Sequence, residues 1–491
     1  MKQIQRFFLV SLTALLLTVF TGTWPTIFKA VARSSNPVYV AQSLNDLAPI
    51  LQQLPTSVRD RLTTFISGDE LYRQGDAEGA AAFYRQVKPD FEVSDTQILE
   101  PIYEAEALSP ESLADWQQAQ LALDDDDEAG AIEALQSLVD REPAFIPAPV
   151  QLAELLMEED EEDEAIAVLE EAATLHPYST EIIMAQVETL ADEKEYLEAS
   201  IAAREFALLN LDHPQAPEFQ ALADEYFEKF SKRRRRRSIF GAIGNLAAGI
   251  LTGDRVPWES WNSAVETAEL VELMLASESE FGASLAAEYR EQLPLVEDPD
   301  VVDYVTQLGL EVAQLMGRDF DYEFYVVQDS VMNAFALPGG KIFVNSGLIL
   351  GANSQAELAG VLAHEAAHSV LSHGIQSFFR DDMLSQFADE VPLGEFATGL
   401  LSLQYSRNQE RQADILGTRV LATAGYAADG LRNFMATLVA MTESAPPEYL
   451  SSHPNSESRV AYLEEMIQRN GYNRYALEGV DKHLAIQAKL S

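Results

Sequence analysis

The sequence predicts a mainly α-helical protein, in which an N-terminal α-solenoid precedes a mainly helical α+β domain with a small sheet. Three observations lead to this fold class. Residues 45–230 are rich in Ala, Leu and Glu, show helical periodicity and repeat every 34 residues. Lys341–Val344 is a short β-branched and aromatic run after the turn sequence Pro338–Gly340. Val361–Leu371 is apolar and alanine-rich, without Pro or Gly, which favours a helix.

The first 32 residues have the pattern of an export signal. Lys2 and Arg6 form a basic head, Phe7–Phe20 is an uncharged apolar run, and Ala30–Ala32 is a small-x-small site. We therefore predict residues 1–32 as a signal peptide, with a retained membrane anchor as the alternative. The expected location is the periplasm or another extracytoplasmic compartment of a bacterium.

Residues 45–230 form the predicted solenoid. Three alanines recur at a spacing of 34 residues: Ala131, Ala165 and Ala199. Two prolines, Pro143 and Pro177, have the same spacing. This period, with small residues where paired helices cross, is the tetratricopeptide signature, although the third proline is displaced to Pro214 and a unit around Leu71–Pro89 is degenerate. Such arrays bind peptides or partner proteins on a concave surface, whereas a helical bundle without a ligand is the alternative.

Residues 231–260 are predicted to link the solenoid to a second domain, residues 261–491. The basic run Lys232–Arg237 precedes Ser238–Gly253, which is uncharged and rich in Ile, Ala and Gly. Three interpretations stay open for residues 232–253: peripheral contact with an anionic membrane, a loop near the functional site, or a basic linker.

The most informative motif of the second domain is His364–Glu365–Ala366–Ala367–His368. On a helix, residues i and i+4 share a face, so His364 and His368 point at a common point. Two neutral imidazoles at this spacing suit a zinc ion, and Glu365 lies about 100° around the helix, where it can reach a metal-bound water. This is the arrangement of a zinc peptidase.

A hydrolytic zinc site needs a third protein ligand, and the best candidate is Glu410. Glu410 and Asp414 are again i and i+4 on a predicted helix. Glu410 would complete a two-His, one-Glu site, and Asp414 could accept a hydrogen bond from the outer ring nitrogen of a ligand histidine. A solvated charged face is the alternative, and the histidine pair makes the ligand interpretation the better one.

Four motifs of this domain, in the same order, resemble those of zinc peptidases of the HtpX, BepA and CAAX prenyl protease type. They are Asn333–Val344, Glu357–Glu365, the pair Glu410 and Asp414, and Ser452–Pro454 followed by Arg459. The resemblance extends from about Glu278 to about Met466. It implies one zinc ion per chain with three ligands: His364, His368 and Glu410. It also implies that Glu365 is the general base.

The resemblance implies a role for His453, and the strand chemistry suggests a second role. His453 is expected to cap the resting metal or to stabilise the oxyanion, supported by Arg459. The strand residues are expected to pair a free edge with an extended substrate peptide, and they are Lys341, Ile342, Phe343 and Val344. An ordinary core hairpin is compatible with that role.

The remaining histidines are expected to be structural. His373 follows His368 by five residues, about 140° around a continuous helix, so we expect it to be structural or to end the helix at Gly374. His176, His213 and His483 have no partner at ligand spacing and are expected on the surface. Acidic and basic residues interrupt Gly374–Leu403, so this segment is expected to be soluble and to act as a lid.

Composition narrows the function further. The chain has no Cys, which excludes thiolate zinc ligands and disulfides, and its net charge of −46 argues against a nucleic-acid partner. We therefore predict an exported zinc endopeptidase that hydrolyses protein substrates, with repeats that bind substrate or a partner protein. In peptidases of the BepA type the repeats follow the peptidase domain, whereas in this chain they precede it. A role in envelope quality control is therefore implied by the resemblance alone. The alternative is a repeat scaffold or chaperone with an inactive peptidase domain.

Overall fold

The computed structural model describes most of the chain between residues 47 and 491. The described ranges are 47, 51–52, 55–91, 100–211, 213–230, 232–233, 278–380, 405–442, 449–453 and 456–491. The predicted leader, nearly all of the 231–260 linker and most of the predicted lid lie outside them. All described residues belong to one compact unit, Leu47–Ser491. Within the described ranges, none of the helices combines the length and apolar composition that crossing a bilayer requires.

Six helices form the repeat array. They are α6 (Pro110–Asp124), α7 (Glu128–Arg141), α8 (Pro147–Glu158), α9 (Glu162–Leu175), α10 (Thr180–Asp192) and α11 (Tyr196–Leu209), and the short η2 (Ala105–Ala107) precedes them. Helices α7, α9 and α11 begin 34 residues apart, and so do the left-handed turn residues before them, Asp126, Asp160 and Lys194. The helix pairs therefore keep the predicted period, and their assignment as tetratricopeptide repeats stays a prediction.

The small residues of the repeat have the packing role that the sequence predicts. Ala131, Ala165 and Ala199 are fully buried, each near the start of the second helix of its pair. A methyl group at these positions lets paired helices approach closely. The apolar core of the array divides into two clusters, one formed mainly by α6 to α9 and one formed mainly by α9 to α11.

An N-terminal helical hairpin, α4 (Thr56–Arg73) and α5 (Ala77–Val87), packs against the C-terminal part of the chain. Lys88 Nζ lies 2.6 Å from Asp429 Oδ1, and Arg73 donates two hydrogen bonds of 2.8 and 2.6 Å to Asp481. These ion pairs, in which Lys88, Asp429 and Asp481 are buried, attach the hairpin to the second domain. The predicted repeat domain over residues 45–230 is therefore corrected, because its first part packs with the second domain and not with the repeats.

The small sheet has three strands: β1 (Glu323–Val327), β2 (Ala334–Leu337) and β3 (Lys341–Asn345). Their order is β1-β3-β2, with β1 parallel and β2 antiparallel to β3. The turn between β2 and β3 requires positive φ at Gly339 and Gly340, 70° and 80°. Strand β3 is buried, and Lys341–Val344 pair with β1 on one side and with β2 on the other. The free peptide-binding edge predicted for these residues is therefore wrong.

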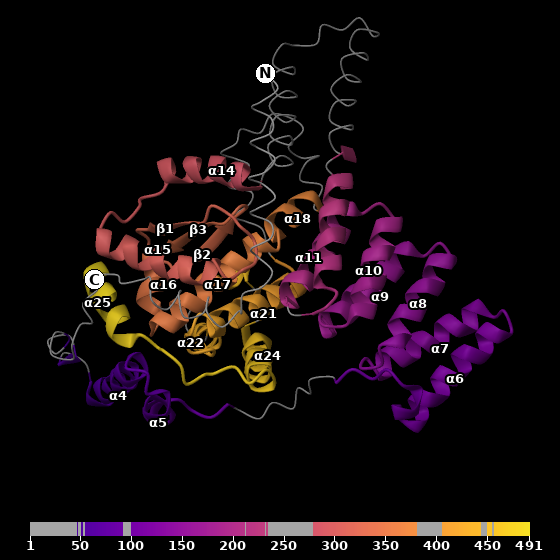
Figure 1. The fold of residues 1–491 in the computed structure, drawn as a ribbon, viewed down its shortest axis with the longest axis horizontal. Helices are drawn as coiled ribbons and strands as arrows, with labels where there is room; N and C mark the ends of the chain where they lie inside the picture. The colour runs from indigo at the N-terminus through magenta and orange to yellow at the C-terminus, as the bar shows by residue number, and fades with distance from the viewer. Residues whose placement is uncertain are drawn as a thin grey trace, which may run out of the picture. The chain divides into compact units, whose positions relative to one another are not determined.

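Helices surround this sheet and build the second domain. They are α14 (Glu278–Gln292), α15 (Pro299–Ala313), α16 (Ser346–Gly351), α17 (Gln355–Val370), α18 (His373–Arg380), α21 (Arg407–Thr423), α22 (Gly430–Thr442), α23 (Tyr449–Ser452), α24 (Ser456–Arg469) and α25 (Val480–Leu490). Every residue of α17 is buried, and this helix contacts β2 and β3 as well as α21 and α22 (Figure 1). The predicted mainly α class with a small sheet is confirmed.

Candidate metal centre

Helix α17 carries the two histidines of the motif. Its N-terminus is capped by Ser354, whose side chain accepts a hydrogen bond from the backbone N–H of Glu357, and regular helix continues to Val370. His364 and His368 therefore lie on one face, with their Nε2 atoms 3.1 Å apart and both rings buried. The local pattern alone accounts for this geometry, because i and i+4 spacing is a property of the helix.

Helix α21 brings the third predicted ligand to the same point. A capping box between Ser406 and Gln409 begins this helix and places Glu410 in its first turn. A Cβ at Gly417 would lie only 3.1 Å from the backbone N of His364, so α21 and α17 approach closely. The carboxylate of Glu410 lies 3.5 Å from Nε2 of both His364 and His368.

His453 completes a group of four buried donors with His364, His368 and Glu410, all within 4.8 Å of one another. Its Nδ1 is 3.3 Å from His364 Nε2 and 2.8 Å from Glu410 Oε1. Donors in a tetrahedral zinc site with bonds of ~2.0–2.1 Å are about 3.3 Å apart. The residues present therefore fit one zinc ion by donor type and by spacing.

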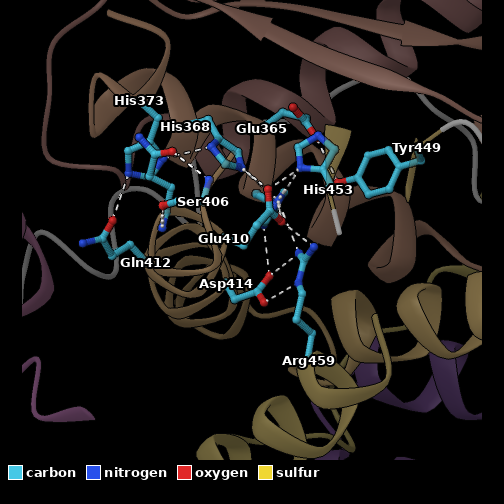
Figure 2. Close-up of polar contacts among 12 residues, drawn as sticks. Glu365, His368, His373, Ser406, Glu410, Gln412, Asp414, Tyr449, His453 and Arg459 are labelled. Carbon is cyan, nitrogen blue, oxygen red and sulfur yellow. Dashed lines mark hydrogen bonds and ion pairs between the residues drawn. The ribbon is translucent and has the colours of Figure 1, made fainter. Parts of the chain in front are cut away.

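Two residues outside the group of four donors, Asp414 and Arg459, hold His364 and Glu410 in place. The outer nitrogen of His364, Nδ1, lies 3.1 Å from Asp414 Oδ1, which is the partner predicted for a ligand histidine. Arg459 donates to both oxygens of Asp414, at 2.8 and 2.7 Å, and forms an ion pair with Glu410 (Figure 2). The expectation that Arg459 supports His453 is thus modified, because its guanidinium holds the two carboxylates instead.

The proposed base, Glu365, lies beside this group. Tyr449 O–H donates a 2.9 Å hydrogen bond to Glu365 Oε1, and His453 Nε2 lies 3.4 Å from the same oxygen. The other oxygen, Oε2, is buried and has no hydrogen-bond partner among the described residues. A buried acceptor of this kind beside a metal group suits an incoming water. Sequence reasoning missed Tyr449, because a lone tyrosine 84 residues from its partner carries no spacing signal.

His453 directly follows the one-turn helix α23. The ring of His453 is buried and stacks on Tyr449, with centroids 4.3 Å apart. This stacking helps to fix the position of the His453 ring next to the other three donors.

Electrostatics distinguish the members of the group. Burial raises the pKa of Glu365, which makes its carboxylate a better base. Burial also lowers the pKa of His364, but hydrogen bonds to Asp414 and Glu410 outweigh it and raise this pKa to about 9. Burial raises the pKa of Glu410, yet His453 and Arg459 together hold it well below its usual range. Carboxylates that stabilise a proton on His364 also stabilise a metal cation, which must displace that proton.

Three histidines outside the group of four donors are buried, and for two of them burial contradicts the predicted surface position. His373 is buried and begins α18, because the helix is interrupted at Ser372, which has a positive φ of 59°. This interruption brings Nδ1 of His373 to 2.9 Å from Nδ1 of His368. His176 and His483 are also buried, and the predicted surface positions are wrong for both. Each ring finds its partners in distant carbonyls: His176 bonds to the carbonyl of Pro143, and His483 to those of residues 349 and 352.

A buried His-Glu-x-x-His helix, with a glutamate and a further histidine around the same point, defines the zinc metallopeptidase class of site. Residues 299–394 and 389–467 match the model of peptidase family M48. This match begins at α15 and ends within α24, so it includes both helices that carry the candidate metal ligands.

Relatives share this part of the chain. A beta-barrel assembly-enhancing protease of Yersinia pestis is 27% identical over 44% of this chain and 49% of its own length. The mitochondrial metalloendopeptidase OMA1 of Arabidopsis thaliana is 32% identical over 29% and 31% of the two chains. The metalloprotease YcaL of Escherichia coli is 27% identical over 31% and 63%. The chain spans about half the length of the first of these relatives.

Proposed function

We propose that this chain is an exported zinc endopeptidase that hydrolyses peptide bonds in protein substrates. The observation that carries the proposal is the buried group of four donors with Glu365 directly beside it. The proposed metal ligands are His364, His368 and Glu410. The M48 domain and relatives named as proteases support the same reaction.

The residues of the site divide the work of hydrolysis. Bound zinc supplies a Lewis acid that polarises the scissile carbonyl and acidifies a water molecule. Glu365 accepts the proton of the attacking water and returns it to the leaving amine, while the hydrogen bond from Tyr449 orients its carboxylate. We assign His453 to the open ligand position at rest and to the developing oxyanion during attack, because it contacts both Glu410 and Glu365.

The substrate strand is reassigned to an edge of the sheet. Among the strands that the structure describes, β2 has a partner on one side only, and it contacts helix α17, which carries His364 and His368. Ser369, one residue beyond the ligand His368, donates a 2.5 Å hydrogen bond to the carbonyl of Leu337 at the end of β2. We therefore propose that an extended peptide pairs with Ala334–Leu337, which would align its carbonyls beside the metal.

The repeat array offers a place for a substrate or partner segment. A cavity of about 460 Å³ lies between α9, α10 and α11 and the start of α21. Its wall includes four glutamates, Glu170, Glu171, Glu198 and Glu205. This charge favours a segment with basic side chains.

The cellular setting is proposed from the relatives and from the leader. An extracytoplasmic location agrees with the export pattern of residues 1–32. A role in envelope quality control is suggested by relatives named beta-barrel assembly-enhancing protease. Membrane contact through residues 232–253 remains a prediction on residues that are almost all outside the described ranges.

The test of the proposed function combines metal content with proteolysis. The purified chain is expected to hold one zinc ion and to cleave casein. Glu365→Gln should keep the zinc and the far-UV circular dichroism spectrum but lose activity by about 10²–10⁴-fold, because only the base is removed. Near-normal turnover by Glu365→Gln would contradict the mechanism. A wild-type chain that binds zinc without cleaving casein would favour the scaffold alternative.

A further inference from the structure

We propose that Glu205, on the repeat helix α11, is the far end of a hydrogen-bond chain that positions the ligand histidine His368. The chain of contacts runs through Gln412 and His373. It would make the affinity of the metal site depend on a residue of the repeat array. The proposal rests on the metal centre proposed above and adds positioning residues to it.

The contacts are continuous from the metal group to the repeats. His368 Nε2 faces the other donors, and its opposite nitrogen, Nδ1, lies 2.9 Å from His373 Nδ1. His373 Nε2 lies 3.1 Å from Gln412 Oε1 and 3.7 Å from Glu205 Oε1. Gln412 Nε2 in turn donates to Glu205 Oε2. Figure 2 shows His373 between His368 and Gln412, on the side of His368 away from His453.

The polarity of these hydrogen bonds permits one arrangement. A metal at Nε2 of His368 takes that lone pair, so the proton of the neutral ring must be on Nδ1. His373 Nδ1 must then accept, which places the proton of His373 on Nε2, where it donates to Gln412 Oε1. The Gln412 amide donates with its other end to the carboxylate of Glu205, which can only accept. Every donor therefore meets an acceptor when the metal and the carboxylate occupy the two ends.

The two ligand histidines are supported in different ways. His364 has a carboxylate, Asp414, directly on its outer nitrogen. His368 has instead a second buried histidine, and its carboxylate lies two side chains further away. Both arrangements orient the ring and select its tautomer, which is what outer partners of metal-bound histidines do. The difference is that Asp414 comes from the peptidase domain and Glu205 from the repeats.

The position of Glu205 depends on how α11 contacts α21. Arg419, on α21, donates to the backbone carbonyls of Leu208 and Leu209 at the end of α11, at 3.1 and 2.6 Å. These bonds hold the C-terminal turn of α11 against the helix that also carries Glu410 and Gln412. The Glu205 side chain is 13% exposed and lies in the wall of the 460 Å³ cavity, so a ligand of the repeats could reach it.

The experiment measures zinc affinity by competition with a chelator, without any activity assay. His373→Leu removes the acceptor for His368 N–H and should weaken zinc binding about 10–100-fold. His373→Asn keeps an acceptor oxygen near the position of Nδ1 and should recover most of that loss. Glu205→Ala acts at the far end of the chain, beyond Gln412, and should weaken zinc binding about 5-fold, less than the loss of a direct partner of His368. Glu188→Ala, an exposed glutamate on the neighbouring helix α10, is the matched control and should change nothing.

The outcomes separate this proposal from the proposed function. Equal zinc affinity in the wild type, His373→Leu and Glu205→Ala would overturn the positioning chain and leave the metal site intact. A wild-type chain without zinc affinity would instead overturn the proposed function. If His373→Leu fails to fold by circular dichroism, Glu205→Ala and His373→Asn still decide. An equal loss in His373→Asn and His373→Leu would contradict the hydrogen-bond role and indicate a packing role.

Discussion

At the residue scale, the candidate site consists of buried charges that stabilise one another. Asp414 and Glu410 are both buried, and both are held by Arg459 as well as by ligand histidines. A carboxylate that binds a metal directly and one that orients a ligand should differ in their effect on affinity. The two positions, one helical turn apart on α21, therefore allow a direct comparison.

The first prediction at this scale compares these two carboxylates. Glu410→Ala should strip zinc from the site, because it removes a ligand. Asp414→Ala should weaken zinc binding by about 10–100-fold, because it removes only the outer partner of His364. Asp303→Ala, at an exposed position on α15, is the control. Metal analysis at low free zinc measures the difference, and full occupancy in Glu410→Ala would show that another residue is the third ligand.

A second prediction concerns His453. His453→Ala should retain zinc, because His364, His368 and Glu410 remain. Its kcat should fall by about 10²–10³-fold if the ring stabilises the oxyanion, as removal of one such donor does. A rise in activity would instead indicate that capping of the resting metal is its main role. Unchanged kcat and KM would leave His453 a structural residue and contradict the assignment.

At the element scale, the N-terminal hairpin is attached to the peptidase domain by a buried cation. Lys88, at the end of α5, forms ion pairs with Asp429 and Glu478, and all three are almost inaccessible to solvent. Asp69, on α4, also accepts the backbone N–H groups of Glu478 and Val480, at 3.0 and 2.9 Å. A hairpin early in the sequence thus neutralises charges that the C-terminal segment buries.

The corresponding prediction is a large loss of stability in Lys88→Met. The substitution takes the cation away from buried Glu478 and leaves Asp429 with Arg474 alone, at 3.3 Å. Removing one partner of a buried ion pair usually costs about 3–5 kcal/mol. Lys229→Met removes an exposed i,i+4 pair with Glu225 and should change stability by less than about 1 kcal/mol. Urea unfolding followed by circular dichroism measures both variants. Equal midpoints for Lys88→Met and the wild type would show that the hairpin contributes little to the domain.

At the scale of the whole molecule, stability should depend on pH through the buried His483. Its Nδ1 contacts Tyr304 O–H at 2.9 Å, and its Nε2 contacts the carbonyls of Ile349 and Ala352 at 3.0 Å. Two carbonyl acceptors at Nε2 require a proton there, so the neutral ring accepts from Tyr304. Burial lowers the pKa of His483 from 6.5 to about 4. This one ring connects α15, α16 and α25.

The sign of the effect follows from this lowered pKa. Above pH 6.5 the ring is neutral in both the folded and the unfolded state, and its contribution to stability is fully present. Between pH 6.5 and about 4 the unfolded state binds a proton that the folded state does not, so stability falls as the pH falls.

Between pH 7.5 and pH 5, we expect the free energy of unfolding of the wild type to fall by about 2 kcal/mol more than that of His483→Gln. The reason is that 1.5 pH units lie between pH 6.5, where the unfolded state begins to bind the proton, and pH 5. Urea unfolding of both proteins at the two pH values measures the difference. A parallel pH dependence of the two proteins would show that His483 does not titrate in this way.

The sequence by itself determined those parts of the site that depend on local geometry. The face shared by His364 and His368, and the turn between Glu410 and Asp414, follow from the helix period alone. The 34-residue period predicted the helix pairs of the repeat array for the same reason, since each unit is a local structure. The choice of zinc followed from the donor types, which are properties of the side chains.

Only the tertiary structure decided which distant groups meet. The position of β3 in the centre of the sheet, the return of His373 to His368 after the break at Ser372, and the contact of Tyr449 with Glu365 all join segments whose separation has no fixed period. The burial of His483 has the same origin. Such contacts depend on the packing free energy of the complete domain, in which each buried polar group must find a partner, and no spacing rule specifies that partner in advance.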